Sequence, residues 1–72
     1  MKLRSLKNQL KALCKACGIT SRVEDIMDYA RECGERMRNA RSERLRQKWR
    51  KRQQLAYQAL SVRQRLSAVA AA

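Results

Sequence analysis

The feature that most constrains this fold is a run of basic residues from Arg36 to Arg52, which holds nine of the chain's eighteen Lys and Arg side chains. Glu43 is the only acidic residue in the run, and no Gly or Pro interrupts it. The run can therefore form a helix with positive charge on most of its circumference. Such a helix cannot enter a protein core, because each unpaired buried cation costs several kcal/mol. The rest of the chain must supply the core, while this run faces solvent or a polyanion.

The composition predicts one small all-α domain. The chain has 72 residues, no Pro, no Phe and a net charge of +12. Its core must come from Leu, Val, Ile, Met, Ala and Cys, which together with abundant Arg, Lys and Gln favour helices over strands. A single core of this size supplies only about 3–5 kcal/mol of stability.

Two segments, 2–17 and 21–37, repeat apolar residues at alternating three- and four-residue spacing, which predicts two amphipathic helices. The two stripes are Leu3, Leu6, Leu10, Leu13 and Cys17, and Val23, Ile26, Ala30, Cys33 and Met37. Gly18 is expected to end the first helix in a left-handed conformation. Ser21 and Glu24 form a capping-box pattern that is expected to start the second. Matching stripes joined by a short turn predict an antiparallel helical hairpin.

A further apolar seam covers 53–69 and allows two architectures. Its members are Leu55, Ala59, Val62, Leu66 and Val69. In the first architecture the hairpin leads into one long basic helix from Arg22 to about Ser67, and the seam needs another copy of the chain, which makes a homodimer. In the second, the helix breaks at Asn39–Ser42 and the third segment folds back into a three-helix bundle, burying Leu45, Trp49 and Leu60. We favour the continuous helix.

The basic run predicts a nucleic-acid partner, because each phosphate neutralised by Lys or Arg releases condensed counterions. The candidate phosphate-binding residues are Arg36, Arg38, Arg41, Arg44, Arg46, Lys48, Arg50, Lys51 and Arg52. Asn39 and Trp49 are the candidates for contacts with bases, although a Trp at this spacing is more often a packing residue. A secondary basic face on the first helix comprises Arg4, Lys7, Lys11 and Lys15.

The run Asn39-Ala40-Arg41-Ser42, followed by Arg44, Arg46, Lys48 and residues 50–52, resembles the arginine-rich helix of bacteriophage N-type antitermination proteins. Those helices open with a similar Asn-Ala-basic-Ser/Thr run and bind a small RNA hairpin in the nascent transcript. The resemblance covers residues 39–52. It implies a phage or mobile-element regulator that binds RNA and cooperates with the transcription machinery, with Trp49 stacking on the RNA loop.

Three alternatives stay open beside the RNA interpretation, which we favour slightly over DNA. Leu55, Val62 and Val69 lie seven residues apart directly after the basic run, as in a DNA-binding zipper dimer. A structural ribonucleoprotein component of the ribosomal type would also carry such a basic helix. The stripe of the first helix, flanked by lysines, is also typical of a helix that binds a protein or a membrane surface.

The cysteine spacing gives only a weak indication of a metal-binding site. Cys14-Lys15-Ala16-Cys17-Gly18 has the form of a zinc knuckle, but only Cys33 remains as a further thiol and the chain has no His. We favour the interpretation of Cys14, Cys17 and Cys33 as small buried hydrophobic residues. No cofactor, no catalytic constellation and no membrane span is expected. The sequence thus predicts a non-enzymatic, cytoplasmic protein with reduced thiols.

Overall fold

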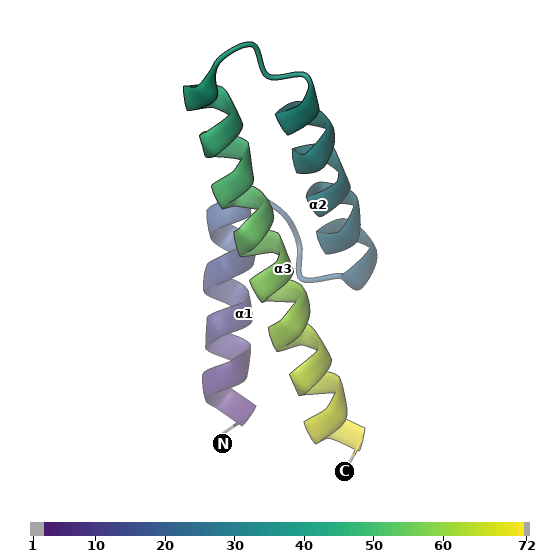
Figure 1. Ribbon diagram of the computed structural model, residues 1–72. Coiled ribbons are helices and arrows are strands. Elements are labelled where there is room, and N and C mark those ends of the chain that lie inside the picture. The colour runs from purple at the N-terminus through teal and green to yellow at the C-terminus, as the bar shows by residue number, and fades with distance from the viewer. Residues whose placement is uncertain (1–2, 72) are drawn as a thin grey trace.

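The computed structural model describes residues 3–71, which form three helices and no strand (Figure 1). These are α1 (Leu3–Cys17), α2 (Val23–Arg38) and α3 (Glu43–Ala71). The molecule measures 46 by 18 by 16 Å, and α3, about 44 Å long at 1.5 Å per residue, spans its whole length. α1 and α2 run in the same direction, and α3 runs back past both (Figure 1). The all-α class with a long C-terminal helix is confirmed.

The end of α1 is as predicted from the sequence, whereas the start of α2 is not. Gly18 ends α1 with a positive φ of 70°, as predicted, and the Ile19 N–H donates to the Cys14 carbonyl at 3.0 Å. The predicted capping box at Ser21 is wrong, because α2 begins only at Val23 and its N-cap residue makes no side-chain cap hydrogen bond. The Thr20 hydroxyl instead donates to the Asp25 carboxylate and accepts from the Arg22 N–H. This local network competes with the capping box.

The favoured continuous helix is also wrong, because the chain turns at residues 39–42. Asn39 is the C-cap of α2, and its N–H donates to the Glu35 carbonyl at 3.0 Å. The Ser42 hydroxyl oxygen accepts a hydrogen bond from the Leu45 N–H at 3.2 Å and so caps the start of α3. The fold therefore follows the alternative in which the third segment turns back.

Each of the first two helices packs on α3 rather than on the other. α2 lies along the N-terminal half of α3 and α1 along its C-terminal half, while α1 and α2 barely touch (Figure 1). The helical hairpin is therefore formed by α2 and α3, which corrects the predicted pairing of the first two helices. One core joins all three helices through Leu6, Leu10, Cys14, Ile26, Ala30, Ala56, Ala59, Val62 and Leu66.

The seam that suggested a homodimer is largely covered within one chain. Ala59, Val62 and Leu66 are buried in the core that α1 completes, whereas Val69 stays 43% exposed. Small side chains allow this close packing, because Ala56 and Ala59 let the helix backbones approach. The seam therefore does not need a second copy of the chain to cover it.

The three-helix alternative predicted that Leu45, Trp49 and Leu60 would be buried, and the structure differs in one respect. Leu60 and Trp49 are half-buried, but Leu45 is 44% exposed, because the upper part of α3 faces only one other helix. No helix in the described part of the chain combines the length and the apolar character needed to cross a membrane.

Candidate nucleic-acid interface

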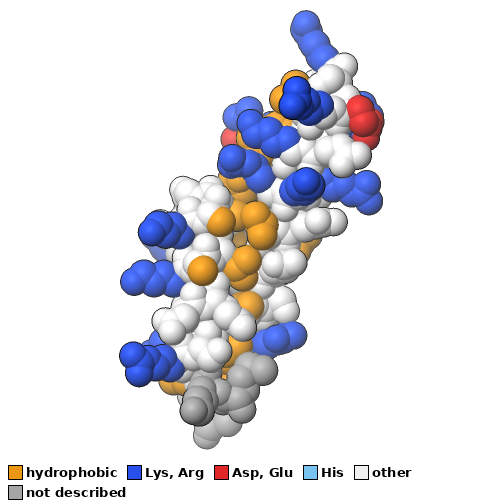
Figure 2. All heavy atoms as spheres, turned by 90° about the vertical axis from the view of Figure 1, so that its left-hand side faces the viewer, with side chains coloured by type: hydrophobic (Ala, Val, Ile, Leu, Met, Phe, Trp, Pro, Cys, Tyr) orange, Lys and Arg blue, Asp and Glu red, His pale blue; other side chains and the backbone are white. Residues whose placement is uncertain are grey.

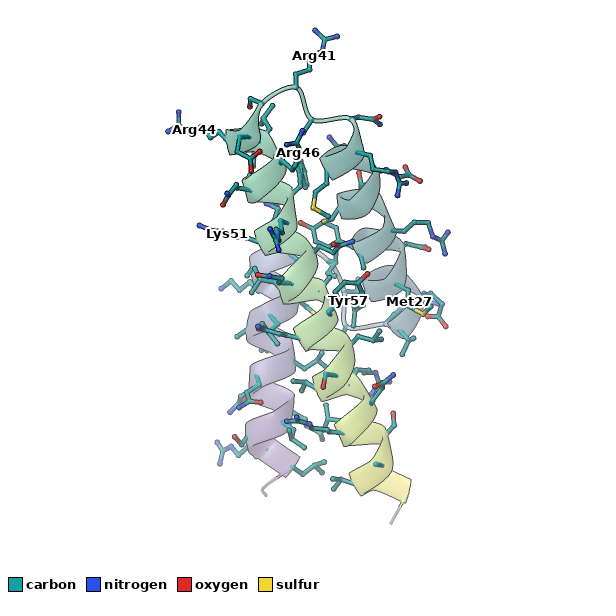
Figure 3. All side chains as sticks on the ribbon, viewed as in Figure 1. Met27, Arg41, Arg44, Arg46, Lys51 and Tyr57 are labelled. Carbon is teal, nitrogen blue, oxygen red and sulfur yellow. The ribbon has the colours of Figure 1, made fainter. Side chains whose placement is uncertain are left out.

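The turn between α2 and α3 places the basic run at one end of the molecule. The run occupies the last turn of α2, the linker and the first two to three turns of α3. Lys and Arg side chains gather at this end in the space-filling view (Figure 2). Arg41 lies at the tip of the linker and points away from both helices (Figure 3). The residues predicted from the sequence as one linear tract thus surround the end of a hairpin.

Three of the nine cations have partners inside the fold. The Arg36 guanidinium lies 3.1 Å from the Glu32 carboxylate, and Arg46 lies 2.8 Å from the Glu43 carboxylate. Arg52 donates to the Tyr29 hydroxyl oxygen at 3.1 Å. The pairs of Arg36 and Arg46 each lie within one helix, whereas the Arg52 bond joins α3 to α2. The linear pattern did not indicate these partners.

The other six cations are exposed, and no carboxylate in the described residues forms an ion pair with them. We call this set the cationic end: Arg38, Arg41, Arg44, Lys48, Arg50 and Lys51. Arg44 and Lys51 project from α3 on the side away from α2 (Figure 3). A polyanion can reach all of these residues without opening the core.

The acids of α2 make its outer face less positive than the linker and α3. The exposed acidic side chains of this helix are Glu24, Asp28, Glu32 and Glu35. They lie on the turns opposite the buried Ile26, Ala30 and Cys33, and so form its outer face. Three of them form exposed ion pairs with Arg22, Arg31 and Arg36, so this face has little net charge. Phosphates are attracted to the linker and α3 instead.

Trp49 lies among cationic side chains and is not a freely exposed ring. It is half-buried, and its ring centroid lies 4.8 Å from the Arg36 guanidinium carbon, 5.4 Å from the Lys48 Nζ and 5.5 Å from the Arg52 guanidinium carbon. These cation–π distances give Trp49 a packing role between α2 and α3. A base that stacks on this ring would compete with these cations. Asn39 stays exposed beside the cationic end.

The secondary basic face lies on the other half of the molecule. Arg4, Lys7, Lys11 and Lys15 are all exposed on α1. Because α1 packs against the C-terminal half of α3, these residues do not join the cationic end in one cluster.

Residues that anchor α3 were missed by sequence reasoning. The Gln53 side-chain amide donates to the Ala30 carbonyl at 3.1 Å, and a Cβ atom at Gly34 would lie 3.1 Å from the same amide nitrogen. Gly34 in the middle of α2 is the one sequence signal for this close approach. The role of Tyr29 as partner of Arg52 had no signal in the sequence.

The three cysteines are buried free thiols. No group of three or more metal-ligating side chains is present in the described residues, so the predicted alternative of a zinc site at Cys14, Cys17 and Cys33 has no geometric support. Burial raises the pKa of all three thiols. For Cys17 the neighbouring thiols raise the pKa further, and Arg52 partly opposes the shift.

The raised thiol pKa values predict that stability falls at alkaline pH. The native state keeps its thiols protonated at pH values where the unfolded chain releases those protons, so the native state binds more protons. The free energy of unfolding should therefore be constant near neutrality and decrease as the pH rises past the ordinary thiol pKa. Urea unfolding between about pH 7 and about pH 10 measures this. The variant Cys33→Ala should show a smaller decrease, and an equal decrease in both proteins would contradict the assignment.

Comparison of the chain with protein-family models, curated proteins and solved structures finds no significant match.

Proposed function

We propose that this protein binds nucleic acid through the cationic end and does so without catalysis. The observation that carries the proposal is the set of six exposed cations without acidic partners, gathered at the end of the α2–α3 hairpin. Each phosphate that these residues neutralise releases counterions, which favours binding. The net charge of +12 adds long-range attraction for a polyanion.

We propose RNA rather than duplex DNA as the partner. A zipper dimer that forks across DNA needs Leu55, Val62 and Val69 to pair between two chains, and Val62 is buried within its own chain. The resemblance of residues 39–52 to N-type antitermination proteins supports an RNA hairpin and a cytoplasmic, phage-type regulatory role. One difference from that family is that Asn39 and Ala40 precede α3 instead of opening it. The proposal therefore places phosphate contacts on the linker and on α3 together.

Fluorescence anisotropy with an RNA-hairpin pool and a duplex-DNA pool tests the proposal. A binder with about six phosphate contacts should lose about 10³ in affinity between 50 and 200 mM salt. We expect RNA hairpins to stay bound at the higher salt and duplex DNA to dissociate. If only DNA stays bound, the choice of RNA is wrong. If neither pool binds with a Kd below about 1 μM at the lower salt, the cationic end does not serve nucleic acid.

A further inference from the structure

A groove of about 740 Å³ lies between α1 and the C-terminal half of α3. It begins at the α1–α2 linker, where Ile19 lines it, and its lining on α1 extends from Lys15 to Leu3, about 18 Å at 1.5 Å per residue. Leu10 and Leu66 form its floor from the two helices, and each is only 6% exposed. The base of the groove is therefore apolar.

The rim of the groove is cationic. Lys7, Lys11 and Lys15 repeat every four residues along α1, about 6 Å apart along the helix axis, and Arg63 lies on the α3 side. Among the described residues, no Asp or Glu lines the groove, and none of these four side chains forms an ion pair. The rim therefore presents positive charge that no acid of the fold neutralises.

An apolar floor beneath a basic rim fits a ligand that has an apolar ridge with acidic groups beside it. An amphipathic helix has this form, and such helices bind by laying their apolar face into a groove. Acids at four-residue spacing on that helix also lie about 6 Å apart, which matches the lysines of α1. A membrane surface is flat and would contact the lysines without reaching Leu10 and Leu66. A single-chain amphiphile carries its charge at one end, whereas the cations follow the length of the groove.

The helices of this chain do not have the charge that the groove requires. α1 and α3 are strongly basic, and three acids of α2 already form ion pairs with arginines. We propose that the groove binds an acidic amphipathic helix of another protein. The cationic end lies at the opposite end of α3 from the groove (Figure 1), so the two surfaces can be occupied at the same time. The proposal is therefore independent of nucleic-acid binding.

Anisotropy of a labelled synthetic peptide, measured without nucleic acid at about 0.15 M salt, tests the proposal. The peptide has about 16 residues, mostly Ala, with Leu at alternating three- and four-residue spacing and a Glu every four residues beside that stripe. The wild-type protein should bind it with a Kd below about 100 μM. A control peptide with Gln in place of each Glu should bind about tenfold more weakly, because the ion pairs are lost. A second control peptide with Ala in place of each Leu should lose at least as much, because the floor is left uncovered.

Charge reversal in the protein locates the contact. The double variant Lys7→Glu with Lys11→Glu should bind the Glu peptide about tenfold or more weakly, because two ion pairs become repulsive. It should gain affinity for a peptide with Lys in place of each Glu. The matched variant Arg44→Glu with Lys48→Glu makes the same charge change at the cationic end, outside the groove. It should bind the Glu peptide within about threefold of the wild type, because charges more than about 8 Å away are screened. All four positions are exposed, and circular dichroism checks that both variants are helical.

The same two variants separate this proposal from nucleic-acid binding, because the cationic-end variant should lose RNA and keep the peptide. An equal loss of peptide binding in both double variants would overturn the groove proposal, since net charge alone would then explain it. Equal binding of the Glu and Gln peptides, or no binding by the wild type up to about 1 mM, would overturn it too. If the wild type ignores the peptide but binds vesicles of neutral and anionic phospholipid, and the Lys7 and Lys11 changes abolish that binding, the rim serves a membrane surface and the proposal is wrong.

Discussion

Changing Arg41, Arg44 and Lys48 together to Gln is expected to weaken nucleic-acid binding and to flatten its dependence on salt. Each lost phosphate contact removes about 0.7 to 0.9 from the slope of log affinity against log salt concentration, so three lost contacts remove about 2–3. Because fewer counterions are released on binding, the affinity at low salt should fall by roughly two orders of magnitude or more. Anisotropy titrations over a series of salt concentrations measure both quantities. The three side chains are exposed, so the fold should be unchanged.

The matched control removes the same charge elsewhere. Arg22, Arg31 and Arg65 are exposed and lie outside the cationic end, and the first two already pair with Glu24 and Asp28. Changing these three to Gln also lowers the net charge by three, but the salt dependence should stay close to that of the wild type. An equal loss in both triple variants would mean that net charge alone drives binding. Unchanged affinity in the first variant would rule out the cationic end as the contact surface.

Replacing Ile26 by Ala should unfold most of the protein. Ile26 is fully buried in the core that joins the three helices. Truncating a buried Ile removes about 2–5 kcal/mol, through the lost transfer free energy and the cavity that is left. A core of this size supplies only about 3–5 kcal/mol in total. Circular dichroism with urea titration should show a large loss of helix at 25 °C, or a midpoint shifted close to zero denaturant.

Leu45→Ala is the comparison variant for this measurement. Leu45 is 44% exposed and lies outside the core cluster, so its truncation should cost about 1 kcal/mol or less. Similar losses in the two variants would mean that the packing of α2 against the rest of the chain is not as described. A stable Ile26→Ala protein would lead to the same conclusion.

Several local features of the fold could be predicted because each depends on a few neighbouring residues. The stripe of α1 and the left-handed Gly18 place the end of the first helix correctly at Cys17. The alternative architecture placed the helix break at Asn39–Ser42, and both end residues of that segment act as caps. The Ser21 prediction failed because Thr20 and Asp25 offered a competing local hydrogen bond, and the energies of such alternatives are too similar for a pattern to separate.

The candidate site was predictable as a set of charges but not as an arrangement. The linear tract identified all nine cations. It did not separate Arg36, Arg46 and Arg52, which have partners, from the six exposed members of the cationic end. For Arg52 the partner is Tyr29, 23 residues away in the sequence, which it meets only because α3 folds back along α2. For Trp49 the sequence left base contact and packing open, because its cationic neighbour Arg36 lies on another helix.

The sequence by itself determined that the chain is helical, that its basic run stays at the surface, and where the chain can turn. These properties follow from helix propensity, from helix capping and from the free-energy cost of burying charge. Each of these effects depends on a few neighbouring residues. Only the tertiary structure decided that the chain does turn at Asn39–Ser42 and that α1 covers the C-terminal half of α3. A cap contributes about 1 kcal/mol, whereas the choice between a continuous helix and a folded-back one depends on burying Ala59, Val62 and Leu66 against α1. That burial involves residues some fifty positions apart along the chain, so no local sequence pattern predicts it.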